Sequence, residues 1–182
     1  LAILGRDDEV RQMDFLPQFD LPPSAVAAEE LELTVVPWRR GIDDIAAKHR
    51  IVMIMEDHFC SKHREFIGAT LPAFKAAGFT HYAAEAISRY DAFPAERGYP
   101  NKFTGLYTSD PQFGNVLRRA LDLEFTVFGY DFRASTHEDR EEFAATRLAE
   151  LFQNDGETKL LVHAGHAHVL KYETDDGRRW LA

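Results

Sequence analysis

Short apolar runs alternate with longer amphipathic stretches along most of this chain. Four segments rich in apolar and aromatic residues read as strands: 51–55, 79–87, 125–131 and 158–168. Four stretches with helical spacing or helix-start signals read as helices: 41–49, 61–77, 111–121 and 137–153. Because strand and helix alternate, the pattern predicts a single α/β domain with a central, largely parallel sheet and helices on both of its faces.

Local signals refine several of these predicted elements. The strand at 51–55 is apolar on every residue, which predicts that both of its faces are covered. Pro72 lies inside the helix at 61–77 and should kink or shorten it, and Gly78 should end that helix. Two helix starts carry capping signals: Asp110 followed by Pro111, and either Ser135 with Glu138 or Thr136 with Asp139.

The first part of the chain differs in composition from the rest. Residues 1–37 are acidic and contain several prolines, which predicts an N-terminal arm with a candidate edge strand at 31–37. The α/β domain is then expected over 38–182. The chain begins at Leu1 rather than Met, so processing or trimming of the N-terminus stays open.

Charge and cysteine content narrow the range of functions. A net charge of −9 argues against a nucleic-acid partner, which would need a basic patch. No apolar run approaches the roughly 20 residues of a membrane span. Cys60 is the only cysteine, which excludes an internal disulfide and favours a cytoplasmic location. The expected partner is a small-molecule ligand or substrate, and the oligomeric state stays open.

Each predicted strand ends in polar residues that can carry chemistry. These are Glu56, Asp57 and His58, then Glu85, then Asp131, and finally His166 and His168. Because the carboxyl ends of parallel strands meet at one edge of a sheet, we expect these side chains to converge on one crevice. Carboxylates and imidazoles together can transfer protons or hold a divalent metal.

Neighbouring polar residues compete for the inward position. We favour Glu56 over Asp57 at the end of the first strand. Of the two last histidines one should point away from the other, and we favour His168 over His166. His163 lies inside the fourth strand and reads as a core histidine with satisfied hydrogen bonds.

Arg140 is unusual on physical grounds. It lies in the first turn of its predicted helix, where a cation opposes the helix dipole at a cost of about 0.3–1 kcal/mol. One interpretation is that it reaches the crevice and pairs with a carboxylate or an anionic ligand. The other is a solvated surface arginine, and both stay open. Glu85 could likewise be a buried partner for an arginine, and Asp131 could cap a turn.

Four short motifs resemble a known superfamily. They are MEDH (55–58), AAEA (83–86), REEFAATRLAEL (140–151) and GHAH (165–168). Their order and placement at strand ends are similar to the superfamily of erythromycin esterases, ChaN-like haem-binding proteins and Tiki/TraB proteins. Residues 97–125 look like a segment of uncharacterised bacterial ChaN-like members, and the resemblance covers about residues 38–182.

The resemblance implies a set of site residues: Glu56, His58, Glu85 and His168, with Arg140 as a supporting residue. Asp131 and His166 join Arg140 as supporting candidates because they follow neighbouring strand ends. The resemblance also implies a sheet of mixed direction. The family glycine of the first motif is Met55 here, which would fill space and narrow the pocket.

The leading functional hypothesis is an ester or amide hydrolase. His58 would activate water, Glu56 or Glu85 would orient its imidazole, and His168 would polarise the substrate or act as a second acid or base.

Two alternatives stand beside this one. The chain could bind haem or another planar ligand without catalysis, using the aromatic residues of the loop at 88–109: Tyr90, Phe93, Tyr99, Phe103 and Tyr107. We favour the interpretation that these aromatics simply pack the loop onto the sheet, and the haem-ligating tyrosine of ChaN-like proteins has no clear counterpart here. The chain could also be a metal-dependent hydrolase, with Zn²⁺ or Mn²⁺ held by His58, His168, Glu56 and Glu85.

Overall fold

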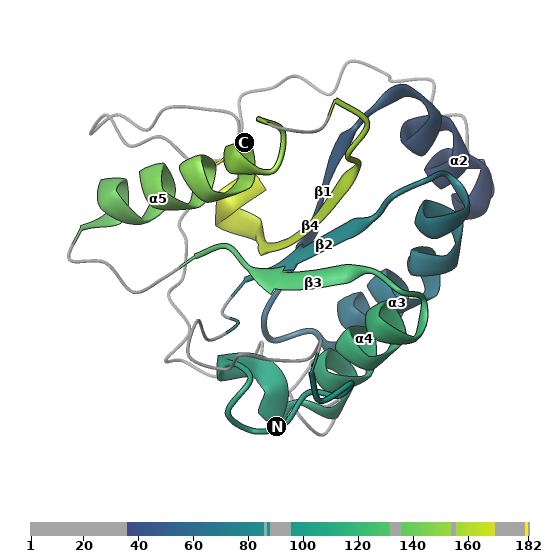
Figure 1. Ribbon diagram of the computed structural model, residues 1–182. Coiled ribbons are helices and arrows are strands. Elements are labelled where there is room, and N and C mark those ends of the chain that lie inside the picture. The colour runs from purple at the N-terminus through teal and green to yellow at the C-terminus, as the bar shows by residue number, and fades with distance from the viewer. Residues whose placement is uncertain are drawn as a thin grey trace, which may run out of the picture.

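A four-stranded parallel sheet forms the centre of the domain (Figure 1). The computed structural model describes residues 36–85, 87, 96–131, 136–153, 156–169 and 181. The strands are β1 (Ile51–Glu56), β2 (His81–Ala84), β3 (Thr126–Gly129) and β4 (Leu160–Gly165). Their order is β1-β4-β2-β3, and each neighbouring pair is parallel. The predicted α/β class is confirmed, and the mixed direction is not found among the described strands.

Helices cover both faces of this sheet. They are α2 (Trp38–Lys48), α3 (Ser61–Ala76), α4 (Pro111–Asp122) and α5 (His137–Glu150), with short 3-10 helices η2 (Leu106–Ser109) and η3 (His166–Val169). Leu71 and Phe74 of α3 and Leu117 of α4 belong to one core cluster, on the face that α2 also covers. Ala144 and Leu148 of α5 belong to the cluster on the other face. Figure 1 shows α5 apart from the other three helices.

The strand order explains this division of the helices. The chain moves across the sheet in one direction from β1 to β2 to β3, through α3 and α4. It then returns to place β4 between β1 and β2, through α5. Parallel crossovers share one hand, so a connection that runs backwards must pass over the opposite face. All four strands therefore deliver their carboxyl ends to the same edge.

The prediction that the first strand is covered on both faces was wrong. β1 lies at the edge of the described sheet, and its Ile51 and Met55 are 49% and 57% exposed. The fully covered strand is β4, which is buried at all six positions between β1 and β2. An apolar run does not show whether its strand lies at the edge or the centre of a sheet, because that position depends on how strands distant in sequence pair.

Most helix boundaries follow the local signals. Asp110 caps α4 by accepting from the Gln112 N–H at 2.8 Å, and Thr136 caps α5 by accepting from the Asp139 N–H at 3.1 Å. Gly78 ends α3 with a φ of +87°, a conformation that glycine adopts without strain.

Two boundaries differ from prediction. α3 runs past Pro72 to Ala76, so the expected shortening was wrong, and α2 begins at Trp38 rather than Gly41. The arm predicted over 1–37, with its candidate strand, lies outside the described residues except for positions 36 and 37. Among the described residues, none of the helices has the length and apolar character needed to span a membrane.

Candidate functional site

The structure brings the four leading candidate residues together at the carboxyl edge of the sheet. Glu56 ends β1, His58 follows two residues later, Glu85 comes directly after β2, and His168 lies in η3 after β4. His58 Nδ1 lies 2.8 Å from Glu56 Oε1. The Nε2 atoms of His58 and His168 lie 3.8 and 3.4 Å from the same oxygen, Glu85 Oε1. Two imidazoles thus face one carboxylate.

Glu56 is the most enclosed carboxylate of the group and is only 1% exposed. Arg64 donates to both of its oxygens, at 2.7 and 2.8 Å, and also donates to Asp110. His163 Nε2 donates to Glu56 Oε2 at 2.8 Å, which leaves His163 Nδ1 to accept from the Tyr82 hydroxyl at 2.6 Å. Burial would raise the pKa of Glu56, but hydrogen bonds from Arg64 and the histidines hold it well below its ordinary value.

His58 is positioned from three sides. Since the ionised Glu56 can only accept, the Nδ1–H of His58 donates to it, and Nε2 is directed toward Glu85. The ring stacks on Tyr107, with ring centres 4.4 Å apart and the planes 24° from parallel. Beneath Nε2 lies Gly165, where an added Cβ would approach that atom to 2.5 Å. Only a glycine leaves room for the ring at this strand end.

Glu85 and Arg140 form the second ionic group of the site. Arg140 Nη2 donates at 2.8 Å to Glu85 Oε1 and at 2.8 Å to Asp131 Oδ2. This settles the two interpretations of Arg140: its guanidinium reaches the crevice and pairs with carboxylates. Burial would raise the pKa of Glu85, but the hydrogen bond from His168 and the Gly165 N–H lowers it to about 2. Glu85 is therefore ionised at neutral pH.

His168 lies between two carboxylates and is only 6% exposed. Its Nδ1 is 2.8 Å from Glu141 Oε1, and its Nε2 is 3.4 Å from Glu85 Oε1. A ring that faces a carboxylate at each nitrogen is best satisfied as an imidazolium with two N–H donors. Burial opposes this charge, but Glu141 and Glu85 raise the pKa of His168 to about 9.

Three other residues considered from the sequence lie differently. Asp57 accepts from the Phe59 N–H at 3.0 Å and so caps the turn after β1. This agrees with the preference for Glu56 over Asp57 as the carboxylate that points toward the site. His166 has an exposed side chain, whereas His168 two residues later is buried. Met55 is 57% exposed and points to the face opposite Glu56, so the expectation that it narrows the pocket was wrong.

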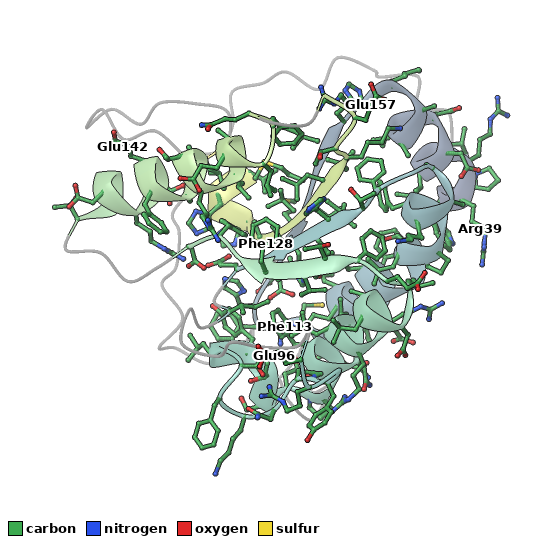
Figure 2. The ribbon with its side chains drawn as sticks, viewed as in Figure 1. Arg39, Glu96, Phe113, Phe128, Glu142 and Glu157 are labelled. Atoms are coloured by element: carbon green, nitrogen blue, oxygen red, sulfur yellow. The ribbon has the colours of Figure 1, made fainter. Side chains whose placement is uncertain are left out.

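Sequence reasoning missed several members of the network: Arg64, Asp110, Tyr107 and Glu141. Arg64 carried a usable signal, because it stands on the buried face of α3 one turn before Ile67 and Gly68. An arginine on an apolar helix face predicts a buried ionic partner. His163 is buried and hydrogen-bonded, as expected of a core histidine, but its partner Glu56 makes it part of the site. Figure 2 shows Phe113 of α4, whose ring centre lies 5.5 Å from that of His163.

The residues predicted as metal ligands do not fit that role well. Within the described part of the chain, no group of three or more His, Cys, Asp or Glu side chains has a metal-binding arrangement. The carboxylates of Glu56 and Glu85 already accept from Arg64 and Arg140, which are cations that a divalent metal would have to displace. The donor set therefore favours proton chemistry over metal coordination.

Solved structures with a similar fold are bacterial toxins and effectors. The type III effector HopBA1 matches with a TM-score of 0.55 and 15% identity, over 75% of this chain and 76% of that one. A structure described as bacterial protein toxins matches with a TM-score of 0.57 and 15% identity, over 81% of this chain and 34% of that one. RRSP, a MARTX toxin effector domain from Vibrio vulnificus CMCP6, matches with a TM-score of 0.50 and 16% identity, over 78% of this chain and 34% of that one. At this identity the likeness concerns the fold alone.

These comparisons correct the family assignment made from the sequence. No family model and no curated protein matches the chain. The matching structures are toxin effector domains rather than erythromycin esterases, ChaN-like haem-binding proteins or Tiki/TraB proteins, so that resemblance was wrong. The haem-binding alternative rested on it and falls with it. Of the loop aromatics, Tyr90 and Phe93 lie outside the described residues. Four short motifs in a chain of this length were too few to identify a family.

Proposed function

We propose that this domain is a hydrolase that cleaves an ester or amide bond by acid–base chemistry at His58 and His168. One observation carries the proposal: the two imidazoles turn their Nε2 atoms toward the same oxygen of Glu85, at 3.8 and 3.4 Å. The two rings differ in their surroundings, because His58 has one carboxylate at hydrogen-bond distance, whereas His168 lies closely between two. A site with one ring set as base and one as acid suits hydrolysis.

The proposed reaction uses each residue in a defined role. His58 Nε2 takes a proton from a water molecule while the water oxygen forms a bond to the carbonyl carbon. Glu56 holds the ring through Nδ1–H and stabilises the imidazolium that results. His168 gives its proton to the leaving oxygen or nitrogen as the scissile bond breaks. Proton exchange with solvent then restores both rings.

Glu85 and Arg140 support this cycle electrostatically. The Glu85 carboxylate favours the protonated form of His168, whose Nε2 lies 3.4 Å from it, and the Nε2 of His58 faces the same oxygen. Arg140 offsets part of that negative charge and keeps Glu85 in place. Toxin effectors also use this fold, so an enzymatic effector is the broader class to which the proposal belongs. The reaction itself is inferred from the site and not from these neighbours.

The test is a broad panel of esters and peptides assayed with the wild type and the His58→Ala variant. We expect turnover by the wild type, and a loss of about 10²–10⁴-fold in kcat for His58→Ala, which is the usual contribution of a general base. His49→Ala is the matched control, because His49 is exposed and precedes β1 at the opposite end of the sheet. It should keep full activity.

Two results would overturn the proposal. The first is an absence of turnover across the whole panel, and the second is a His58→Ala variant as active as the wild type. Repeating the assay after dialysis against EDTA separates this mechanism from the metal-dependent one. Loss of activity on chelation, restored by Zn²⁺ or Mn²⁺, would favour the metal mechanism instead.

A further inference from the structure

Residues 97–109 form a segment that precedes α4 and contacts the proposed site through Tyr107. Within this rim segment (residues 97–109), Gly105 pairs in an antiparallel bridge with Ile87, two residues after Glu85. Tyr107 stacks on His58, and the next residue after the segment, Asp110, is bonded to the buried Arg64. The rim segment is therefore fixed directly to the residues that carry the proposed chemistry.

The backbone of the rim segment is held by its own hydrogen bonds. Asn101 Oδ1 accepts from the Phe103 N–H at 2.8 Å, and Thr104 Oγ1 accepts from the Asn101 N–H at 2.8 Å. Thr108 Oγ1 donates to the Gly105 carbonyl at 2.6 Å, and Thr104 is fully buried. These turns hold the side chains between them in defined positions.

Three large apolar side chains of the rim segment nevertheless face outward. Leu106, Phe103 and Tyr99 are 74%, 70% and 53% exposed, which is more than almost every other large apolar side chain described. Isolated exposed apolar residues are ordinary, but these three lie within eight consecutive positions of the chain. Leu106 directly precedes Tyr107, which stacks on His58, so these exposed side chains are candidates for holding a substrate.

The charge of the rim segment differs from that of the chain as a whole. The chain carries a net charge of −9, yet positions 97–109 contain Arg97 and Lys102 and no carboxylate. The Lys102 ammonium lies 4.9 Å from the ring centre of Phe103, and the Arg97 guanidinium 5.3 Å from that of Tyr99. Glu96, labelled in Figure 2, immediately precedes the segment.

We propose that the rim segment is a docking surface for a polypeptide substrate that carries acidic and apolar side chains next to the bond to be cleaved. This inference rests on the proposed hydrolase function and specifies its substrate class. Aromatic and aliphatic anchors flanked by cations suit a partner segment that offers both apolar and carboxylate groups.

Other occupants suit the surface less well. An anionic membrane is bound by clusters of four or more basic residues, and the rim segment has two on a strongly acidic chain. A second copy of the chain would bring a net charge of −9 against another of the same sign. A separate acidic segment, small enough to contact mainly the rim, avoids most of that repulsion.

Binding can be measured without relying on turnover. Two pools of dye-labelled peptides, one rich in Asp, Glu, Leu and Phe and the other rich in Lys, Arg and Ser, are titrated with the non-cleaving His58→Ala protein. Fluorescence anisotropy should show tighter binding of the acidic–apolar pool. Adding Phe103→Ser with Leu106→Ser should weaken that binding by about tenfold or more, because buried apolar anchors dominate interfaces. Lys102→Glu should reduce or reverse the charge preference.

The controls separate docking from folding and catalysis. Phe66→Ser removes an exposed aromatic from α3, outside the rim segment, and should leave peptide binding unchanged. The double change, made in a protein that keeps His58, should leave the melting temperature unchanged. Peptide binding that survives the double change overturns the docking proposal. So does an equal affinity of the two pools.

Two further outcomes have distinct meanings. If p-nitrophenyl acetate and the other esters are not hydrolysed, yet the acidic–apolar peptides still bind through Phe103 and Leu106, the hydrolase proposal fails and the docking surface stands. If the double change abolishes binding to vesicles that contain phosphatidylserine but does not affect peptide binding, the surface is a membrane contact and the docking proposal is wrong.

Discussion

Gly165 is the residue at which the absence of a side chain matters most to the proposed site. A Cβ at this position would lie 2.5 Å from His58 Nε2 and 3.0 Å from Glu85 Oε2. His58 cannot simply swing away, because Glu56 and Tyr107 hold the other parts of its ring. The glycine of the GHAH motif is therefore required by close approach of a side chain to the backbone.

Gly165→Ala should disable the site more than it harms the fold. We expect kcat/KM on the best substrate of the ester and peptide panel to fall by about 10²-fold, because small displacements of reacting groups are costly. The loss in stability should stay at about 1–3 kcal/mol, as for other overpacked positions. Paired measurements of kcat/KM and of urea unfolding test this expectation.

Gly41→Ala is the control for that substitution. Gly41 lies in α2 with nothing within 4 Å of an added Cβ, so alanine should gain up to about 1 kcal/mol of stability and leave kcat/KM unchanged. If Gly165→Ala is as active as Gly41→Ala, the position of His58 does not matter for turnover.

Single residues were predictable where local rules decide between neighbours. Successive side chains of a strand point to opposite faces, so only one of Glu56 and Asp57 can point toward the site. The partners of Glu56 were not predictable in this way. His163 comes from a strand 107 positions away, and its pairing depends on β4 entering the sheet beside β1. No local pattern encodes that entry.

At the scale of elements, α3 is tied to the site through a buried arginine. Arg64 links the end of β1 to the start of α4, because its guanidinium donates to both Glu56 and Asp110. Its ring neighbours Tyr107 and Phe113 lie 5.1 and 5.4 Å from the guanidinium carbon. The Arg64 side chain of α3 therefore contacts β1, the start of α4 and η2, and Arg64 is only 2% exposed.

Removing that cation should destabilise the fold strongly. Arg64→Ala leaves two carboxylates without their main partner, and breaking a buried ion pair in this way typically costs about 3–5 kcal/mol. Adding Asp110→Asn should recover part of the loss, because one of the stranded charges disappears. Urea unfolding of the single and double variants measures both effects.

Arg118→Ala is the matched comparison for Arg64→Ala. Arg118 is exposed on α4 and donates to Asn115 at 3.0 Å, so its loss should change stability by no more than about 0.5 kcal/mol. Equal costs for Arg64→Ala and Arg118→Ala would mean that the buried cation contributes no net stability.

Elements with a strong local signature were predictable, and their placement was not. The N-caps Asp110 and Thr136 fix helix starts through hydrogen bonds within four residues, so short sequence patterns suffice. The edge position of β1 and the central position of β4 follow instead from the returning crossover through α5. Alternation of elements predicts the fold class, but several strand orders satisfy it equally well.

At the scale of the whole molecule, the site concentrates ionisable groups that also affect stability. Glu85 and His168 are both buried, and each favours the charged form of the other. The pKa of Glu85 is lowered to about 2 and that of His168 is raised to about 9. The two shifts describe one interaction in part, so their contributions should not be added.

The sign of each shift sets the pH range in which the fold is strengthened. The folded state holds the His168 proton more tightly than the unfolded chain does, so this contribution is complete below about pH 6.5 and lost as the pH rises through about 9. Glu85 contributes to the free energy of unfolding above about pH 4.5, and this contribution disappears as the pH falls through about 2. Glu56, whose pKa is also lowered, acts in the same acidic range.

His168→Gln should therefore flatten the alkaline side of the stability profile. Urea unfolding of the wild type between pH 6 and 9.5 should lose up to about 3 kcal/mol more than the variant does, since one pKa unit corresponds to about 1.4 kcal/mol. The difference between the two proteins removes the effect of lysines and tyrosines that begin to titrate in the same range. His49→Gln, at an exposed position, should follow the wild type throughout. If wild type and His168→Gln decline in parallel, His168 is not held as an imidazolium, and its role as the acid of the proposed reaction is lost with it.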